Sequence, residues 1–245
     1  MQDATTRKQA GVLYLVPASL GDASWEITLP AHARNIICDL DCFVVENAKT
    51  ARAQLKRIGY PRPLQSVEIL ELPKNAADTD CVKLLQPLIA GRSIGLMSEA
   101  GCPAVADPGA VIVRAAHQHG IRVVPLVGPS AILLALMASG LNGQRFAFHG
   151  YLPVSEADRN KAILDLEAES SRLDQTQVAI ETPYRNDSLF RSVLNVCRPD
   201  TLLCIATDIT AASETITTRS IAAWRRAARP ELAKRPSVFL LLAQR

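Results

Sequence analysis

Residues 96–109 (LMSEAGCPAVADPG) place a serine, an acid and two glycines directly after an apolar run. Ser98 and Glu99 end that run, and Gly101 follows them closely. Glycine adopts backbone conformations that are closed to other residues, and without a side chain it lets a ligand approach the main chain. These residue types in this order indicate a loop that binds a ligand largely through backbone groups.

Two other segments of the chain have the same character. Gly128-Pro129-Ser130 follows an apolar run at residues 122–127, and residues 17–22 (PASLGD) follow a run at residues 12–16. The carboxyl ends of parallel strands meet at one edge of a sheet, where the ligands of open α/β proteins bind. Any one of these segments could be an ordinary turn, but three of them at strand ends predict a binding cleft.

The segments between these loops alternate between two kinds of periodicity. Helical spacing predicts helices at residues 48–58, 80–90 and 111–119, whereas short apolar runs predict buried strands at residues 12–16, 42–45, 93–97 and 122–127. Strand–helix–strand alternation predicts a parallel sheet that is covered on both faces.

Beyond Gly140 the predicted elements are more widely spaced. We expect a helix at residues 155–170 and strands at residues 146–148, 177–181, 202–206 and 238–242. The fold class implied by this order is α/β, with two α/β domains and a ligand cleft between them. Residues 1–127 are expected to form an N-terminal domain around a mainly parallel sheet, and residues 128–245 a C-terminal domain.

Proline and glycine mark the ends of two predicted helices. Asp107 and Pro108 stand where an N-cap and a first helical residue would be, and Gly120 stands where that helix would stop. The next helix, residues 131–139 (AILLALMAS), ends before Gly140 in the same way. It is apolar on nearly every side, so we expect it to be buried.

Composition limits the functions that are open to the chain. Hydrophobic residues make up 48% of it, an ordinary value for a globular protein with a sizeable core. The cysteines form no Cys-x-x-Cys pair and the histidines are scattered, so no metal site is expected. No stretch reaches about 18 apolar residues and no apolar signal core is present, which predicts a cytoplasmic protein without a membrane segment.

Basic residues gather in two groups, although the net charge is only +3. Each group could be a solvated helix face or, alternatively, a surface for a phosphate-rich substrate. The first group is Lys49, Arg52, Lys56, Arg57 and Arg62, and the second is Arg225, Arg226, Arg229, Lys234 and Arg235.

Several well-known site motifs are missing from the sequence. It contains no P-loop, no G-x-G-x-x-G after the first predicted strand and no G-x-S-x-G nucleophile elbow. With these kinds of site excluded, we expect the ligand to be a small, largely uncharged molecule that is held mainly by main-chain groups.

Three blocks of sequence together resemble the tetrapyrrole methylase superfamily. They are Leu15-Val16-Pro17, residues 98–109 (SEAGCPAVADPG) and residues 124–131 (VPLVGPSA). Within this superfamily the chain is most similar to the small-subunit ribosomal RNA methyltransferase I group. The similarity extends through residues 146–153 (FAFHGYLP) and 180–185 (IETPYR) to the strand predicted near residues 237–242. The resemblance implies a dimeric, two-domain methyltransferase that uses S-adenosylmethionine and 2′-O-methylates ribosomal RNA in the cytoplasm.

The resemblance also implies which residues bind the cofactor, in the cleft between the domains. In the first domain these are Pro17, Ser98, Glu99, Ala100 and Gly101, followed by Pro129, Ser130 and Ala131. In the second domain they are Glu181, Thr182, Pro236 and Ser237. No metal ion takes part, and the expected partners are a second copy of the chain and ribosomal RNA or the small ribosomal subunit.

A hydroxyl acceptor requires a base to remove its proton, and carboxylates at strand ends are the candidates. Glu46 and Glu99 are the predicted catalytic residues. Each could instead be structural: Glu99 could cap N–H groups of its own turn, and Glu46 could pair with Lys49 or Arg52.

The sequence departs from the group's usual motifs at positions that bear on the substrate. The group typically has Ser-Asp-Ala-Gly-Thr-Pro where Glu99 and Cys102 stand here, and Ala-Glu-Asp-Thr-Arg where residues 45–49 are VENAK. Two alternatives to RNA methylation therefore stay open. One is a methyltransferase for a small molecule such as a tetrapyrrole, and the other is a non-catalytic protein that binds S-adenosylmethionine.

Overall fold

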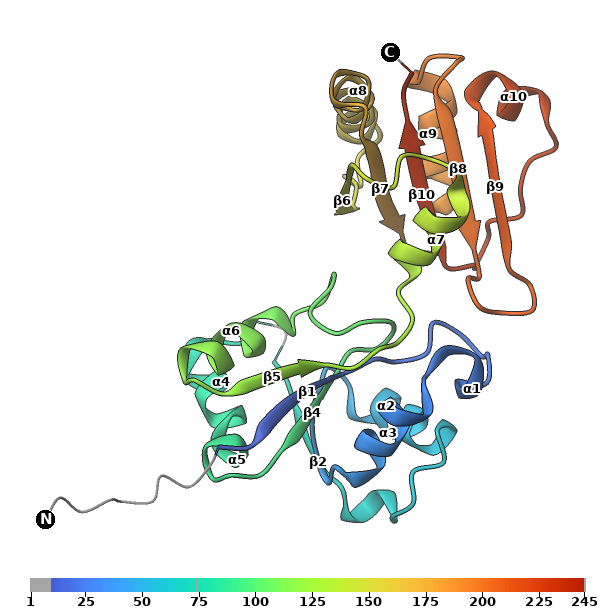
Figure 1. The fold of residues 1–245 in the computed structure, drawn as a ribbon. Helices are drawn as coiled ribbons and strands as arrows, with labels where there is room; N and C mark the ends of the chain where they lie inside the picture. Colours follow the sequence, from blue (N-terminus) through green and yellow to red (C-terminus); the bar gives the residue numbers. More distant parts are fainter. Residues whose placement is uncertain (1–9, 74, 245) are drawn as a thin grey trace, which may run out of the picture. The chain divides into compact units, whose positions relative to one another are not determined.

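The computed structural model describes residues 10–73 and 75–244, and the chain forms two compact units, Met1–Pro129 and Ser130–Arg245 (Figure 1). Each unit has its own five-stranded sheet and its own helices. The predicted fold class, α/β in two domains, is confirmed.

The first unit is built on a parallel sheet with strand order β3-β2-β4-β1-β5. The central strands are short runs of apolar residues, as expected for strands that are buried on both faces. Their bounds are β1 Val12–Val16, β2 Cys42–Val45, β3 Glu68–Glu71, β4 Ile94–Met97 and β5 Arg122–Pro125.

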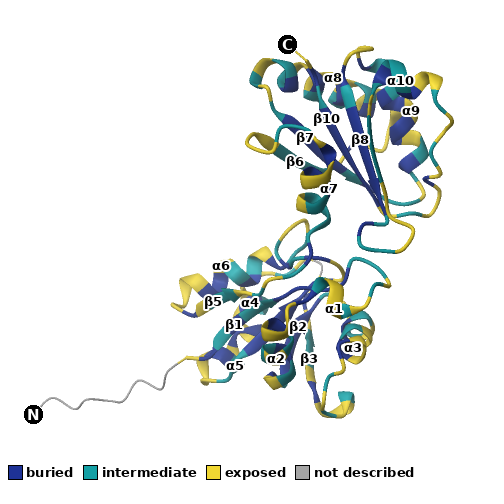
Figure 2. Cartoon of the chain, turned by 45° about the vertical axis from the view of Figure 1, so that its right-hand side comes forward, coloured by how far each residue is buried: buried dark blue, intermediate teal, exposed yellow. Residues whose placement is uncertain are grey.

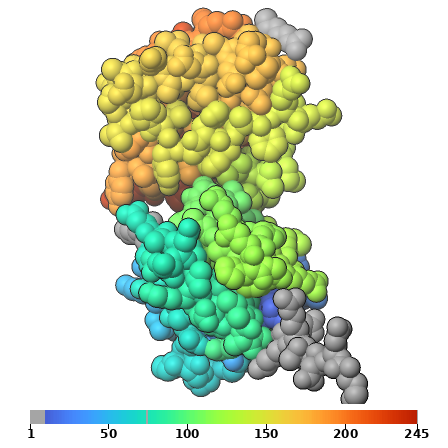
Figure 3. Space-filling model, turned by 90° about the vertical axis from the view of Figure 1, so that its left-hand side faces the viewer, coloured from blue at the N-terminus to red at the C-terminus, as the bar shows by residue number. Residues whose placement is uncertain are grey.

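Helices cover both faces of this sheet. Because side chains alternate along a strand, Phe43 and Val45 enter one core with α2 and α3, whereas Val44 enters the other with α4, α5 and α6. The surfaces of α4 and α6 lie side by side in the space-filling view (Figure 3). The helices are α1 Trp25–Thr28, α2 Ala31–Asp39, α3 Ala48–Arg57, η1 Leu64–Ser66, α4 Asp78–Leu84, α5 Gln86–Ile89 and α6 Ala110–Gln118.

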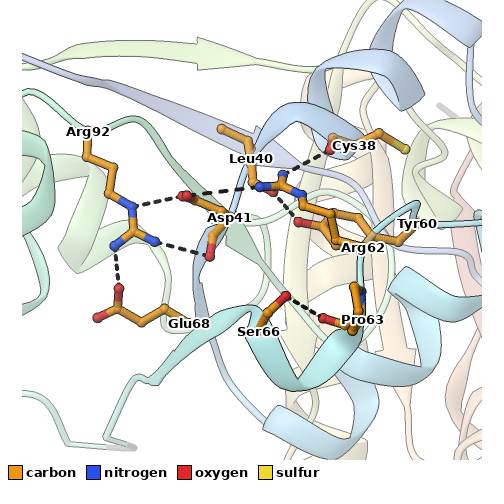
Figure 4. Close-up of polar contacts among 9 residues, drawn as sticks. All are labelled: Cys38, Leu40, Asp41, Tyr60, Arg62, Pro63, Ser66, Glu68 and Arg92. Atoms are coloured by element: carbon orange, nitrogen blue, oxygen red, sulfur yellow. Dashed lines mark hydrogen bonds and ion pairs between the residues drawn. The ribbon is translucent and has the colours of Figure 1, made fainter.

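Two arginines form hydrogen bonds and ion pairs that link the segments at the amino edge of this sheet (Figure 4). Arg92, just before β4, donates to Asp41 Oδ1 at 2.8 Å and also pairs with Glu68 at the start of β3. Arg62 donates to the main-chain carbonyls of Cys38, at 3.0 Å, and of Leu40. The charged side chains at this edge therefore neutralise one another or satisfy carbonyl groups.

The second unit has a mixed sheet with strand order β6-β7-β10-β8-β9. Only β6 and β7 are parallel, and the other three pairings are antiparallel. The strands are β6 Phe146–Tyr151, β7 Thr176–Glu181, β8 Leu202–Thr207, β9 Thr215–Ser220 and β10 Ser237–Leu242.

The main core of the second unit lies between this sheet and three helices. Phe190 and Trp224 pack edge to face within it, with ring centroids 5.6 Å apart. The helices of this core are α8 Glu156–Leu173, α9 Asn186–Val196 and α10 Ile221–Arg226. Figure 2 shows the strands β7, β8 and β10 as largely buried.

Helix α7 (Ala131–Ser139) packs against β8, β9 and β10 and ends, as predicted, at Gly140 with φ +70°. The expectation that it is buried all round is wrong. Ala135 and Leu136 are buried, but Leu133 is 51% exposed and Met137 78% exposed. The helix therefore packs one side on the sheet of the second unit and leaves Leu133 and Met137 of another side exposed. No helix in the described residues is long and apolar enough to cross a membrane.

Candidate functional site

The carboxyl edge of the first sheet contains a topological switch point between β1 and β4. The two strands are neighbours, but the chain leaves β1 toward α2 on one face and leaves β4 toward α6 on the other. A crevice forms where neighbouring connections diverge in this way, and it is the usual ligand position in open α/β sheets. Two main-chain hydrogen bonds between Ala18 and Gly101, at 2.9 and 3.1 Å, join the diverging segments.

The loop after β4 holds an unusual backbone conformation. Gly101 has φ +71°, and Ala104 and Ala106 also lie in the left-handed region, at +65° and +63°. Alanine in this region costs about 1–3 kcal/mol, so the surrounding contacts must fix the loop. Asp107 supplies them, because its Oδ1 accepts the N–H groups of Ala104 at 3.0 Å and Gly109 at 2.7 Å.

The prediction that Asp107 is the N-cap of the following helix is wrong. Helix α6 begins at Ala110 and has Gly109 as its N-cap, without a side-chain cap. Asp107 instead bonds to the N–H two residues ahead, an Asx turn that competes with helix capping. The carboxylate is therefore used to shape the loop, and the N-cap lies two residues later than the sequence suggested.

The loop after β5 meets the loop after β1 with no room for a side chain. A Cβ atom at Gly128 would lie 2.2 Å from Cβ and Cγ of Pro17. Cys102 adds a contact from the β4 loop, since its Sγ lies 3.4 Å from the carbonyl oxygen of Pro129. The three loops predicted to bind a ligand thus lie together at one edge.

Small residues leave main-chain groups accessible at this edge. Ser98 is 7% exposed and donates to the carbonyl of Ala100 at 3.2 Å. Within the described part of the chain, the N–H groups of Ala100 and Gly128 donate no hydrogen bond. A small apolar hollow at the same edge is lined by Pro17, Met97 and Pro129 together with side chains from α1 to α3. This arrangement suits a ligand that backbone N–H groups hold and apolar surface covers.

The structure brings the two predicted bases together. Glu46 follows β2 and Glu99 follows β4, and Glu46 Oε1 accepts the N–H of Glu99 at 3.2 Å. Burial raises the pKa of Glu46, and the nearby carboxylates of Asp107 and Glu99 raise it further, against the N–H of Glu99, which lowers it. A carboxylate with a raised pKa is a stronger proton acceptor than an ordinary one.

These acids have no cationic partner among residues 10–73 and 75–244. Among the described residues, no ion pair includes Glu46, Glu99 or Asp107. The predicted alternative, in which Glu46 pairs with Lys49 or Arg52, is therefore wrong. The carboxyl edge keeps a local negative charge.

The predicted residues of the second unit also lie together. Glu181, the last residue of β7, is the cross-strand partner of Ser237, the first of β10. Glu181 is 5% exposed, pairs with Arg185 and accepts the N–H of Thr182 at 2.6 Å. Its carboxylate is thus already engaged, and the groups left for a ligand here are main-chain and hydroxyl groups.

Asn186 organises this second edge, and sequence reasoning missed it. Its fully buried side-chain amide donates to the carbonyls of Leu232 at 3.2 Å and Arg235 at 2.7 Å, and to Ser237 Oγ at 3.2 Å. It therefore fixes the segment that contains Pro236 to the start of α9. Nothing in the local sequence could have revealed it, because the residues it binds lie more than forty positions away.

The remaining predicted residues open helix α7. Ser130 is its N-cap, with Oγ accepting the N–H of Leu133 at 3.4 Å, and Ala131 is its first residue. In the residues that the structure describes, no group of three His, Cys, Asp or Glu side chains is placed to hold a metal ion.

No protein-family model matches the chain, but curated proteins do. It is 30% identical over 212 residues to a protein of Vibrio cholerae, covering 86% of this chain and 69% of that protein. It is also 30% identical over 215 residues to a protein of Escherichia coli O157:H7, covering 88% and 71%. For a protein of Xylella fastidiosa the identity is 29% over 234 residues, covering 96% and 81%. All three are named ribosomal RNA small subunit methyltransferase I.

Solved structures agree with this similarity at the level of the fold. The methyltransferase CobJ superposes with a TM-score of 0.63 at 18% identity, covering 96% of this chain and 95% of CobJ. Uroporphyrin-III-C-methyltransferase of Thermus thermophilus gives 0.52 at 18% identity, covering 95% and 92%. The chain is a methyltransferase that belongs to the ribosomal RNA small subunit methyltransferase I family.

Proposed function

We propose that this methyltransferase transfers a methyl group from S-adenosylmethionine to a ribose 2′-hydroxyl of ribosomal RNA in the small subunit. The observation that carries the proposal is the pair Glu46–Glu99 at the carboxyl ends of β2 and β4, with which no cation of the described residues forms an ion pair. Family membership supports the RNA substrate, because the relatives are named for it.

The first unit offers groups that suit the donor. The free N–H groups of Ala100 and Gly128 can bind its carboxylate or ring nitrogens, and Gly101 lets it approach the main chain. The unneutralised carboxylates of Glu46 and Glu99 attract a positively charged sulfonium. The predicted donor contacts in this unit are Pro17, Ser98, Glu99, Ala100, Gly101 and Pro129.

The second unit contributes the other predicted contacts. Ser130 and Ala131 open α7, and Glu181, Thr182, Pro236 and Ser237 lie where β7 ends and β10 begins. Since the Glu181 carboxylate is engaged by Arg185, we assign it the role of holding this turn in shape. Thr182, Pro236 and Ser237 then offer main-chain and hydroxyl groups to the donor.

When bound, S-adenosylmethionine supplies an electrophilic methyl group on a positive sulfur. The chain aligns the acceptor hydroxyl with that methyl and removes its proton. Glu46 is the base, because burial raises its pKa and its Oε1 is fixed by the N–H of Glu99. Alignment contributes up to about 7–11 kcal/mol and general-base catalysis about 10²–10⁴-fold in rate.

We further propose that the chain works as a homodimer in the cytoplasm, where its substrate is assembled. The partly exposed side of α7, with Leu133 51% and Met137 78% exposed, supports an association through this helix. Light scattering at micromolar concentration tests it: Met137→Glu is expected to turn a dimer into a monomer.

Calorimetric titration with S-adenosylmethionine and S-adenosylhomocysteine tests the donor site. Gly101→Val and Ser130→Trp are expected to abolish binding, the first because valine is strained at φ +71°. Gly120→Val is the matched control. Gly120 also has a positive φ, +66°, but it lies between the end of α6 and the start of β5, at the amino edge of the first sheet. Loss of binding in this control as well would assign the effect to backbone strain and not to the site.

Transfer of a radiolabelled methyl group tests the acceptor. Small ribosomal subunits are expected to be labelled at a ribose, whereas uroporphyrinogen is not. Donor binding by the wild type without label in any acceptor would contradict the RNA proposal and favour the non-catalytic alternative. Absence of donor binding would contradict the whole assignment.

A further inference from the structure

Helix α3 has a continuous basic side that faces away from the core. Its sequence, AKTARAQLKR, contains four cations and no acid. Ala51 and Leu55 are buried against the sheet, whereas Lys49, Arg52 and Lys56 are exposed. Residues three and four apart share a helix face, so the spacing 49, 52 and 56 aligns these cations opposite the buried side. Along the axis they span about 10 Å.

These three cations have no partner within the described residues. None of the ion pairs or side-chain hydrogen bonds there includes Lys49, Arg52 or Lys56. The fourth cation, Arg57, differs because it donates to Asp22 Oδ1 at 2.8 Å and to the carbonyl of Gly21. The free charges are therefore confined to one row.

Three of the five cations in the other basic group are bound inside the fold. Arg225 donates to the carbonyls of Leu194 and Cys197, Arg229 pairs with Asp187, and Arg235 pairs with Asp208. Arg62, from the first group, is likewise bound to main-chain carbonyls. In the described part of the chain, Arg226 and Lys234 of the second group have no side-chain partner, whereas the α3 row has three such cations aligned on one helix face.

The row starts at the candidate site. Helix α3 begins two residues after Glu46, and Asn47 caps it by accepting the N–H of Thr50 at 3.0 Å. Lys49 is thus in the first turn, next to the edge where Glu46 and Glu99 meet, and Lys56 is two turns farther away. A polyanion bound along the row would pass directly beside the proposed base.

We propose that Lys49, Arg52 and Lys56 form a track that binds the phosphate backbone of the RNA substrate and leads it to Glu46. The inference rests on the proposed function, since it names how the same site holds its acceptor. An anionic membrane is a poorer match, because the remaining exposed residue of the row's face is Ala53, and interfacial helices need large apolar side chains. Lysine and arginine without acidic neighbours suit phosphates spaced along a strand.

The test compares three variants of the whole chain. The track variant is Lys49→Gln, Arg52→Gln and Lys56→Gln. The matched control, Lys161→Gln, Arg191→Gln and Arg226→Gln, removes the same charge from exposed cations of the second unit that have no ion pair in the described residues. The third variant, Lys49→Arg, Arg52→Lys and Lys56→Arg, keeps the charge, and circular dichroism checks that all three are folded.

Binding of a single-stranded RNA of mixed sequence is measured by fluorescence anisotropy over a series of salt concentrations. Each phosphate contact contributes about 0.7 to the slope of log K against log salt, or about fivefold in affinity at 0.1 M salt. The track variant is therefore expected to bind about 100-fold more weakly, with a slope smaller by about 2. The control and the charge-keeping variant are expected to bind as the wild type does.

Methyl transfer and donor titration separate this inference from the proposed function. If the inference holds, the track variant keeps its affinity for S-adenosylhomocysteine, and its KM for small ribosomal subunits rises more than its kcat falls. Equal RNA binding by the track variant and the wild type, in a wild type that methylates the subunits, would overturn the track but not the function. Equal weakening in the control would also overturn it, because net charge alone would then explain the loss.

Discussion

The amino and carboxyl edges of the first sheet differ in how their charged side chains are paired. At the amino edge, Arg92 bridges Asp41 and Glu68, so opposite charges meet. At the carboxyl edge, Glu46 and Glu99 stand together, and no cation of the described residues pairs with them. The strands between the two edges are the same, so the difference lies in the loops that enter and leave each strand.

This contrast separates residues that hold the sheet together from residues that are free to act. Paired charges at one end satisfy one another and gain little from a ligand. At the other end, burial raises the pKa of Glu46, and the carboxylates there create a field that a bound cation can use. The comparison predicts that changes at the amino edge alter stability alone, whereas changes at the carboxyl edge alter binding or catalysis.

The largest effect is expected for Glu46→Gln. Glutamine keeps an oxygen that can accept the N–H of Glu99, but it cannot take a proton, so kcat should fall about 10²–10⁴-fold. Glu71→Gln is the control, since Glu71 ends β3 at the same edge and accepts the N–H of Ala48 at 2.7 Å. Steady-state methyl transfer measures both, and an unchanged kcat in Glu46→Gln would remove Glu46 from the mechanism.

Two glycines allow the edges to be compared directly. A Cβ at Gly128 would lie 2.2 Å from Pro17, and a Cβ at Gly11 would lie 2.1 Å from the carbonyl oxygen of Arg92. Either change to alanine forces main-chain or ring atoms apart and should cost about 1–3 kcal/mol in the free energy of unfolding.

Urea unfolding measures that loss, and calorimetry on the folded fraction measures donor affinity. Gly128→Ala is expected to weaken donor binding as well as stability, whereas Gly11→Ala should weaken stability alone. Equal effects on donor affinity would show that the two edges are not functionally distinct.

A smaller effect is expected for Arg92→Met. The change removes the pairs with Asp41 and Glu68 but keeps much of the aliphatic side chain. Partly exposed ion pairs are each worth about 0.2–1 kcal/mol, so the free energy of unfolding should fall by about 0.4–2 kcal/mol for the two pairs, with donor affinity unchanged. Arg114→Met, at an exposed arginine of α6 that has no ion pair in the described residues, is the control. A weakened donor affinity in Arg92→Met would contradict the assignment of this edge to stability.

The smallest effect concerns the pH dependence of stability. Because folding raises the pKa of Glu46, the native state binds the proton more tightly than the unfolded chain does. The free energy of unfolding therefore falls as pH rises from the ordinary glutamate value through the raised one. In Glu46→Gln this fall is absent. The free energy of unfolding of the variant minus that of the wild type should therefore increase with pH over that window and stay constant below it. Thermal melts at a series of pH values follow it, and a difference that shrinks with rising pH would contradict the raised pKa.

The sequence predicted strongly apolar elements well and weakly apolar ones poorly. The bounds expected for residues 12–16 and 42–45 match β1 and β2, because buried parallel strands are continuous apolar runs. Strand β3, Glu68–Glu71, was missed because it lies at the sheet edge and begins and ends with a charged residue. The helix expected at residues 80–90 is broken between α4 and α5, and Pro87 lies in the second piece.

The candidate site was predictable in its residues but not in its contacts. Turn chemistry identified Gly101 and Gly128 because their conformation and spacing are local properties. The bond between Glu46 and Glu99 depends on β2 and β4 being neighbours, and strand order cannot be deduced from alternation along the chain. The role of Asn186 depends on a segment far away in sequence, so it too required the structure.

Strand β10 occupies the middle of the second sheet although it is the last of the five in the chain. During synthesis β7 and β8 therefore emerge with the edges that β10 will join still open, and this sheet closes only after residues 237–242 have left the ribosome. Open strand edges pair readily with other chains. A product that stops short of these residues is thus a substrate for chaperones and proteases, whereas the first unit, whose strands end at Pro125, can fold while the rest is being made.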